Sequence, residues 1–302
     1  MDRRDFIAAA VAAGAAPMTS FGAEEKTAKP AGKFKLKYGP GFGLFENHAG
    51  KDPLDQLKFF SDEGFSAMFD NDLHKKPVEL QEKIAKQCQQ LNLAMGPFIA
   101  YAEFSKPTFV QKDDTIRDML VKRIKAAVEV SQRTGCKTGI VVPGAYAINR
   151  EWDYQTANVI ENLKFCAGVC EPAGFIMVIE PLNNWRDHPG LFLSKMPQAY
   201  QICKAVNSPS CKILEDMYHQ QITEGNLIPN IERCWDEIAV FHIGDTPGRN
   251  EPTTGEINYR NIFKHIHNKG FQGVLCMEHG RSKAGKDGEQ AVIDAYRWCD
   301  DF

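Results

Sequence analysis

The segment Phe175-Ile-Met-Val-Ile-Glu180 places five apolar residues in a row directly before a carboxylate. A short continuous apolar run of this kind, preceded by Gly174, predicts a β-strand that is buried on both faces. Helical periodicity is found on either side of it, over residues 154–171 and 195–206. The segment therefore predicts a strand of a parallel sheet that is covered by helices.

The same alternation of short apolar runs and longer amphipathic runs extends along the chain in both directions. The predicted strands are Lys35–Gly39, Ala67–Phe69, Ala94–Ile99, Lys137–Val142, Phe175–Glu180, Lys212–Asp216, Val240–Ile243 and Gly273–Glu278. The predicted helices are Pro53–Glu63, Pro77–Leu91, Asp113–Thr134, Tyr154–Glu171, Lys195–Val206, Leu227–Trp235, Tyr259–Asn268 and Gly288–Cys299. Eight strands that are each followed by a helix indicate an α/β fold of the closed (β/α)8 TIM-barrel type.

Glycines support this division. Gly64, Gly135, Gly174 and Gly270 each follow a helical run and precede a strand, where a left-handed C-terminal cap is expected. An open doubly wound sheet is the alternative, and Gly39-Pro40-Gly41-Phe42-Gly43 could then be a phosphate-binding turn. No helix is predicted to begin there, so the barrel is favoured, as a single domain over residues 34–302.

The first residues are expected to lie outside that domain. Met1 to Phe6 carries the pair Arg3-Arg4 and is followed by the apolar run Ile7–Ala16. This run is shorter than the roughly 20 residues that span a bilayer, so no stable membrane insertion is expected. Residues 1–22 instead resemble a twin-arginine export signal, with residues 23–33 as a linker. Such a signal implies a periplasmic protein, whereas a merely disordered N-terminus would leave it cytoplasmic.

Composition narrows the range of partners. Hydrophobic residues make up 43% of the 302-residue chain, the formal net charge is −3, and the basic residues are scattered. A nucleic-acid surface is therefore disfavoured. The nine cysteines form no CxxC pair, and most fall within predicted strands or helices, which indicates buried thiols rather than disulfides.

Each of the last four predicted strands ends at a group that can bind a metal ion. These groups are Glu180, Asp216, His242 and Glu278. Neighbouring strands are about 5 Å apart, so four consecutive ends can converge near the barrel axis. Three carboxylates at the ends of apolar strands are costly to bury without a compensating cation. One divalent ion would resolve this cost, with Mn²⁺ or Mg²⁺ best suited to the donors and Co²⁺ or Zn²⁺ as alternatives. Taken singly, each residue could simply begin a solvated loop.

Two further side chains flank these ligands. His219 lies three residues after Asp216 and could bond a substrate oxygen, although a surface histidine is an equal alternative. Arg249 lies in the Gly- and Pro-rich segment after His242, which suggests an ordered loop, and it could clamp a carboxylate. The alternative for Arg249 is a surface pair with Glu251 or Glu256.

Several strings resemble the hydroxypyruvate isomerase family of the xylose isomerase-like barrels. They are IEPLNN at 179–184, LEDMYHQQ at 214–221, FHIGDTPGRNEPTTGEINY at 241–259 and GFQGVLCMEHG at 270–280. The resemblance implies that Glu180 and Glu278 are the catalytic acid/base pair and also metal ligands, with Asp216 and His242 completing the metal set. It implies that His219 and Arg249 contact the substrate. The sequence departs from the family at His279, where an aromatic residue is usual.

The resulting hypothesis is a metal-dependent isomerase that acts on a small hydroxy-carbonyl compound, such as hydroxypyruvate interconverting with tartronate semialdehyde. One glutamate would remove a proton next to the carbonyl, and the other would return it to the adjacent carbon through an enediolate. The alternatives are a keto-sugar 3-epimerase, an endonuclease IV-like metal phosphodiesterase and a non-catalytic sugar-binding barrel. The partner is expected to be a small molecule, and the chain is either a monomer or a homo-oligomer.

Overall fold

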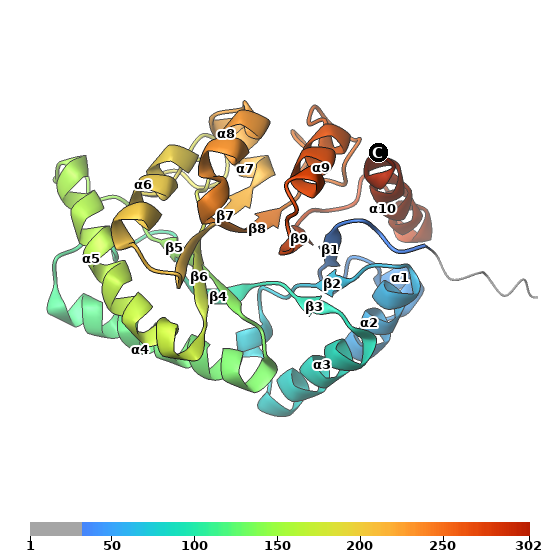
Figure 1. Ribbon diagram of the computed structural model, residues 1–302, viewed down its shortest axis with the longest axis horizontal. Helices are drawn as coiled ribbons and strands as arrows, with labels where there is room; N and C mark the ends of the chain where they lie inside the picture. Colours follow the sequence, from blue (N-terminus) through green and yellow to red (C-terminus); the bar gives the residue numbers. More distant parts are fainter. Residues whose placement is uncertain (1–31) are drawn as a thin grey trace, which may run out of the picture.

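The apolar segments predicted as strands form parallel β-structure with helices packed around its outside (Figure 1). The computed structural model describes residues 32–302, so the expected export signal and nearly all of the linker lie outside the described residues. The strands are β1 Lys37–Pro40, β2 Ala67–Met68, β3 Ala94–Met95, β4 Phe98–Glu103, β5 Thr138–Pro143, β6 Ile176–Ile179, β7 Cys211–Asp216, β8 Ile238–His242 and β9 Val274–Met277. The helices are α1 Glu46–Ala49, α2 Pro53–Asp62, α3 Val78–Leu91, α4 Asp114–Thr134, α5 Trp152–Cys170, α6 Met196–Val206, α7 Met217–Thr223, α8 Leu227–Cys234, α9 Tyr259–Asn268 and α10 Gly285–Asp300, with short 3-10 turns η1 Leu73–Lys75, η2 Glu171–Ala173 and η3 Trp235–Glu237.

Seven strands form one sheet in the order β1-β9-β8-β7-β6-β5-β4, and every pair in it is parallel. The strands β2 and β3 form a separate parallel pair. Single backbone bonds connect this pair to its neighbours, from Phe69 N to Pro40 O at 3.1 Å and from Ile99 N to Asn71 O at 3.0 Å. The fold is therefore a single-domain α/β barrel of the TIM type whose strand ladder is interrupted on both sides of β2–β3.

Because of this interruption, one predicted strand is found as two separate strands. The run Ala94–Ile99 is divided into β3 and β4, with Gly96 and Pro97 between them. Pro97 has no N–H group and cannot continue a ladder, while Gly96 N donates to Met68 O of β2 at 2.7 Å. The first half of the run consequently pairs with β2 and the second half with β5.

All eight predicted helices are present, with ends that shift by at most a few residues. Gly64, Gly135, Gly174 and Gly270 have φ of 83°, 76°, 61° and 75°, which confirms that the chain takes the left-handed conformation after each of these helices. Helices α1 and α7 were not predicted. They have four and seven residues, too few for a hydrophobic period to show in the sequence.

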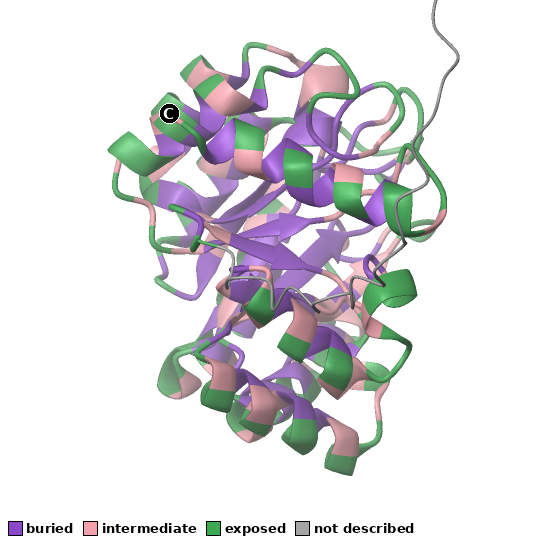
Figure 2. Ribbon diagram, turned by 90° about the vertical axis from the view of Figure 1, so that its right-hand side faces the viewer, coloured by how far each residue is buried: buried purple, intermediate pink, exposed green. Residues whose placement is uncertain are grey.

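Side chains alternate along each strand between two apolar layers. On β6, Val178 points into the cluster inside the barrel, whereas Met177 and Ile179 belong to the larger cluster between the sheet and the helices. Figure 2 shows the result, with buried strands at the centre and exposed surfaces on the outer helices.

The nine cysteines are all buried, and all of them are free thiols. Burial raises the pKa of several of them, for example that of Cys136 to about 12, so these thiols behave as small apolar side chains. Across residues 32–302, no helix has both the length and the apolar composition that crossing a membrane requires.

Candidate metal centre and active site

The alternation along the strands places four ligating groups on top of the inner apolar layer. The layer includes one residue from each of the last four strands, namely Val178, Leu214, Val240 and Cys276. A residue two positions further along a strand points to the same face. The residues at those positions are Glu180, Asp216, His242 and Glu278.

The four predicted ligands converge in space. One ligand atom from each lies within 4.8 Å of the others, and together they form a group that could hold a metal ion. His242 Nδ1 is 3.1 Å from Glu278 Oε2 and 3.5 Å from Glu180 Oε1. Asp216 and His242 are 1% and 0% exposed, so their charges receive little help from water. The convergence predicted from the strand ends is confirmed.

The donor chemistry fits a divalent cation. Three carboxylates meet in a largely buried space, and their mutual repulsion requires more positive charge than one imidazole supplies. The ring nitrogen of His242 that faces Glu180 and Glu278 is Nδ1, so this atom could join the carboxylates on one ion. Carboxylate oxygens with one imidazole suit a fairly hard ion that prefers octahedral geometry.

Arg249 supplies part of the positive charge that the three carboxylates require. Its Nη2 donates to Asp216 Oδ2 at 2.9 Å and to Glu278 Oε2 at 2.6 Å, and its guanidinium lies 4.7 Å from the centre of the Tyr218 ring. The surface pairing with Glu251 or Glu256 is therefore wrong, because Glu251 accepts from Ser282 instead. Arg249 also has a positive φ of 51°, which the loop around it maintains through bonds from Arg249 N to Asp245 O and from Gly280 N to Arg249 O.

The two glutamates occupy different electrostatic surroundings. Burial raises the pKa of Glu180, and the nearby charges of Glu278 and Asp216 raise it further. Burial would also raise the pKa of Glu278, but His242, Arg249 and a hydrogen bond from Asn71 outweigh it and hold that pKa well below the usual range. For His242, the two glutamates overcome the effect of burial and raise the imidazole pKa.

His219 is fixed as a hydrogen-bond donor toward the site. Asn183 Oδ1 accepts from the backbone of Arg186 and Asp187, so the amide NH₂ of Asn183 faces His219 Nδ1 at 2.6 Å. Nδ1 therefore accepts, and the proton of the neutral ring is on Nε2, which is 3.6 Å from Asp216 Oδ2. Burial lowers the pKa of His219 to about 4, which keeps the imidazole neutral. The solvated surface histidine is thereby excluded.

Asp216 connects this histidine to the ligand group. Its Oδ1 caps α7 by accepting from Tyr218 N at 2.8 Å and from His219 N at 3.2 Å. Its Oδ2 remains on the side of Arg249 and the other candidate metal ligands. The Asp-x-x-His spacing is thus a helix cap that also orients two functional side chains.

Asn71 is a site residue that was missed in the sequence. Its Nδ2 donates to Glu278 Oε1 at 2.7 Å across a sequence separation of 207 residues. It follows β2 closely, so the strand-end rule applied to the last four strands could have found it if it had been extended to the second. Asn183 and His188, in the loop after β6, were likewise not singled out.

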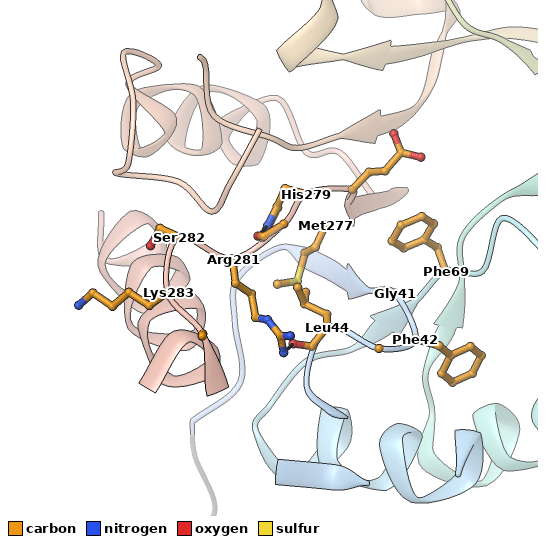
Figure 3. Close-up of a pocket in the computed structure, with 13 residues that line it drawn as sticks. Gly41, Phe42, Leu44, Phe69, Met277, His279, Arg281, Ser282 and Lys283 are labelled. Atoms are coloured by element: carbon orange, nitrogen blue, oxygen red, sulfur yellow. Dashed lines mark hydrogen bonds between the residues drawn. The ribbon is translucent and has the colours of Figure 1, made fainter. Parts of the chain in front are cut away.

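A hollow of about 600 Å³ opens beside Glu278, lined in part by the loop after β1 (Figure 3). Phe69 and Met277 lie on its inner side, and Arg281 and Lys283 lie on the segment that leads into α10. The Phe69 ring is centred 5.7 Å from the His242 ring. Glu278, whose side chain is 25% exposed, can therefore be reached by a small molecule.

Curated relatives of this chain are named as isomerases. It is 36% identical over 129 residues to the 2-oxo-tetronate isomerase of Cupriavidus necator, covering 43% of this chain and 49% of the relative. It is 30% identical over 179 residues to the hydroxypyruvate isomerase of Escherichia coli, covering 59% of this chain and 66% of the relative. Each of these two matches spans less than two thirds of the relative's own length.

Solved structures share the fold. An AP endonuclease of family 2 from Brucella melitensis superposes with a TM-score of 0.70 at 23% identity, covering 84% of this chain and 96% of the other. The D-psicose 3-epimerase of Clostridium cellulolyticum H10 also superposes with a TM-score of 0.70, at 15% identity, covering 87% of this chain and 98% of the other. A likeness at such low identity establishes the fold and leaves the reaction open.

A family model decides the relationship. It matches residues 57–302, which include all four converging ligands, and it describes the xylose isomerase-like TIM barrels. The chain therefore belongs to the xylose isomerase-like TIM barrel family.

Proposed function

We propose that this protein is a metal-dependent isomerase that interconverts a small hydroxy-carbonyl compound, of the hydroxypyruvate and tartronate semialdehyde type, through an enediolate. The observation that carries the proposal is the group of Glu180, Asp216, His242 and Glu278, which holds two glutamates at one point beside an accessible hollow. The names of the curated relatives, hydroxypyruvate isomerase and 2-oxo-tetronate isomerase, support the same class of reaction.

Two carboxylates are what this reaction requires. Isomerisation removes the proton from the carbon next to the carbonyl and returns a proton to the neighbouring carbon, while the substrate's oxygens exchange their roles. One of Glu180 and Glu278 acts as the base and the other as the acid. His219 Nε2–H donates to a substrate oxygen, and Arg249 balances the negative charge of the carboxylates and of an acidic substrate.

A divalent ion, with Mn²⁺ or Mg²⁺ as the first choice, would be held by the four ligands and would polarise the substrate's carbonyl and hydroxyl oxygens. Asn71 fixes the outer oxygen of Glu278, and Asn183 fixes the ring of His219. These two amides keep the reacting groups oriented, in the way that surrounding hydrogen bonds orient metal ligands and bases in other enzymes.

The test is substitution of each glutamate by its amide. We expect Glu180→Gln and Glu278→Gln each to lower kcat by about 10³-fold or more, because loss of a general base or acid typically costs about 10²–10⁴. The reaction is measured as deuterium incorporation from heavy water into hydroxypyruvate. Glu161→Gln on the exposed side of α5 is the matched control and should leave the rate unchanged. Full activity of either site variant would remove that glutamate from the mechanism.

A keto-sugar 3-epimerase is the second candidate, supported by the shared fold of D-psicose 3-epimerase. It would use the same paired glutamates but would invert one carbon instead of moving the carbonyl. Product analysis by NMR on ketohexoses and on hydroxypyruvate separates the two reactions. Metal content near one ion per chain would argue against a phosphodiesterase that uses several zinc ions, since the part of the chain that the structure describes contains one such ligand group.

A further inference from the structure

Exposed apolar side chains gather on the face of the barrel that carries the candidate site. Within residues 32–302, nine large hydrophobic residues are exposed, and seven of them fall between residues 104 and 185. One of the seven, Phe165, lies in the interior of α5. The other six follow the ends of β4, β5 or β6 more closely in the chain and are Phe104, Tyr146, Ile148, Trp152, Tyr154 and Trp185. Phe104, Tyr146 and Ile148 line one hollow, and the Trp152 ring is centred 5.8 Å from that of Tyr146. Exposed apolar side chains that adjoin one another in this way usually mark a place where something binds.

Part of this surface forms a hollow of about 710 Å³, which we call the aromatic groove. Its walls include Phe104, Tyr146 and Ile148, together with Pro107 and Pro189. Phe104 is 49% exposed and Ile148 is 89% exposed, so neither contributes much to the core. Phe104 packs against His188, and about half of its surface remains open to a ligand, whereas Ile148 is almost fully open.

Backbone bonds make the groove a built feature. Ala145 N donates to Lys106 O, Tyr146 N to Gly190 O, and Phe192 N to Gly144 O, each at 3.0 Å. These bonds join the loops after β4, β5 and β6 to one another. Gly144 has φ of 96°, and a Cβ there would come within 2.6 Å of Lys106 O, so this junction requires glycine.

Ring contacts connect the groove to the candidate active site. His188 stacks on Phe104 with ring centres 5.2 Å apart, and it lies 5.3 Å from the ring of His219. His219 in turn faces Asp216. The groove is therefore separated from Asp216 and the other candidate ligands by two successive ring contacts. A three-carbon acid at those ligands, with C–C bonds of about 1.5 Å, is too short to span both contacts.

The chemistry of the walls indicates a neutral, hydroxylated occupant. Ser105, Gln111 and Asn149 offer hydrogen bonds beside the rings, and none of the side chains that line the groove carries a charge. Apolar faces combined with a few amide and hydroxyl groups are suited to a sugar ring, which presents C–H groups on its faces and hydroxyls at its edge.

We propose that the aromatic groove is a subsite for a glycosyl group attached to the reacting hydroxy-carbonyl unit. The preferred substrate is then a glycosylated ketose, and a free small acid or ketose is the minimal reacting unit. This proposal rests on the proposed function, because it places the reacting unit at the same glutamates.

The test compares ketoses with and without a glucosyl group. Maltulose and isomaltulose are glucosylated fructoses, and fructose and hydroxypyruvate are the small probes, all followed by deuterium incorporation. We expect kcat/KM for a glucosylated ketose to exceed that for fructose by about tenfold or more, through a lower KM. Phe104→Ala and Ile148→Ser should abolish this advantage and leave hydroxypyruvate turnover within about twofold, since stacking of one ring contributes at most about tenfold.

Phe165→Ala is the matched control, because Phe165 on α5 is 50% exposed but lies outside the groove. This substitution should change neither kcat/KM for the glucosylated ketoses nor the turnover of hydroxypyruvate. Equal losses on all substrates, or no loss in the groove variants, would overturn the proposal. If the groove variants had an altered sedimentation coefficient but an unchanged KM for the glucosylated ketoses, the subsite proposal would be overturned. The groove would then be an interface between copies of this chain.

The groove can be tested even if the proposed reaction fails. If none of the probes exchanges deuterium, binding of maltulose is measured by saturation-transfer NMR on the metal-loaded protein. Binding to the unsubstituted protein that Phe104→Ala abolishes and Phe165→Ala retains would support the glycosyl subsite while the isomerase proposal is withdrawn. Maltulose binding that is absent, or that is unaffected by Phe104→Ala, would refute the subsite itself.

Discussion

The guanidinium of Arg249 contacts two of the four candidate metal ligands, Asp216 and Glu278. Its own pKa is raised, because the surrounding carboxylates outweigh the effect of burial, so it remains charged. A metal ion that binds this group of carboxylates has to share their oxygens with Arg249. We therefore expect the arginine to lower the affinity of the site for a cation while it stabilises the three carboxylates.

We expect Arg249→Met to bind Mn²⁺ about tenfold more tightly than the unsubstituted protein. Two like charges about 4 Å apart repel each other even at the high effective dielectric constant of a protein surface. Isothermal titration calorimetry at pH 7 measures the change. Arg260→Met is the control, since Arg260 contacts Trp298 and Asp301 away from the ligands. Weaker Mn²⁺ binding by Arg249→Met would contradict this account of the arginine.

The fold of the segment between β8 and α9 determines the position of Arg249. Asp245 accepts from Gly255 N at 2.9 Å and from Ile257 N at 3.0 Å, and Glu256 N donates to Thr246 O. The segment is therefore folded back on itself as an ordered loop, as its glycines and prolines predicted. A Cβ on Gly255 would lie 1.7 Å from Thr246 O, so the turn can be closed only by glycine.

Gly255→Ala should consequently displace the loop and Arg249 with it. We expect a loss of about 2 kcal/mol in the free energy of unfolding, within the usual range for forced backbone shifts, and a reduced kcat/KM. Urea unfolding and steady-state kinetics measure the two effects. Gly168→Ala in the interior of α5 meets nothing within 4 Å and should stabilise the protein by about 1 kcal/mol. Unchanged stability of Gly255→Ala would show that the loop does not depend on this close approach.

The four candidate metal ligands come from four different strands, so a cation bound to all of them would stabilise the second half of the barrel as a unit. Glu180, Asp216, His242 and Glu278 follow or end β6, β7, β8 and β9, the second half of the barrel. A cation bound to all of them holds these strands in their native arrangement, and it binds the folded state in preference to the unfolded one.

Mn²⁺ at about 100 times its Kd should therefore add about 2.7 kcal/mol to the stability of the folded state. For a chain of this size, that corresponds to a rise in Tm of roughly 5 °C or more. Differential scanning calorimetry with Mn²⁺ and then with EDTA measures the rise and its reversal. His242→Phe should show no such response. If none of Mn²⁺, Mg²⁺, Co²⁺ and Zn²⁺ changed the Tm, this result would argue against a metal centre.

The sequence alone was sufficient to predict the strand–helix order and the convergence of the four candidate ligands. A period of two along a buried strand is a local property, so Val178 and Glu180 share a face whatever the rest of the chain does. The ends of helices are also determined by local sequence. Gly135, directly after α4, takes the positive φ that glycine tolerates best. The four ligands could be found because parallel strands bring their ends to the same edge.

The contacts that support the four candidate ligands, and the places where the strand ladder is interrupted, became apparent only in the folded chain. Asn71 bonds Glu278, and His188 bridges His219 and Phe104, through contacts between loops that are distant in the sequence. Arg249 reached the carboxylates because the fold of its loop aims it there. Such contacts depend on how separate loops pack, and no local period or spacing encodes that. The division of residues 94–99 into β3 and β4 has the same origin, since each half pairs with a different neighbour.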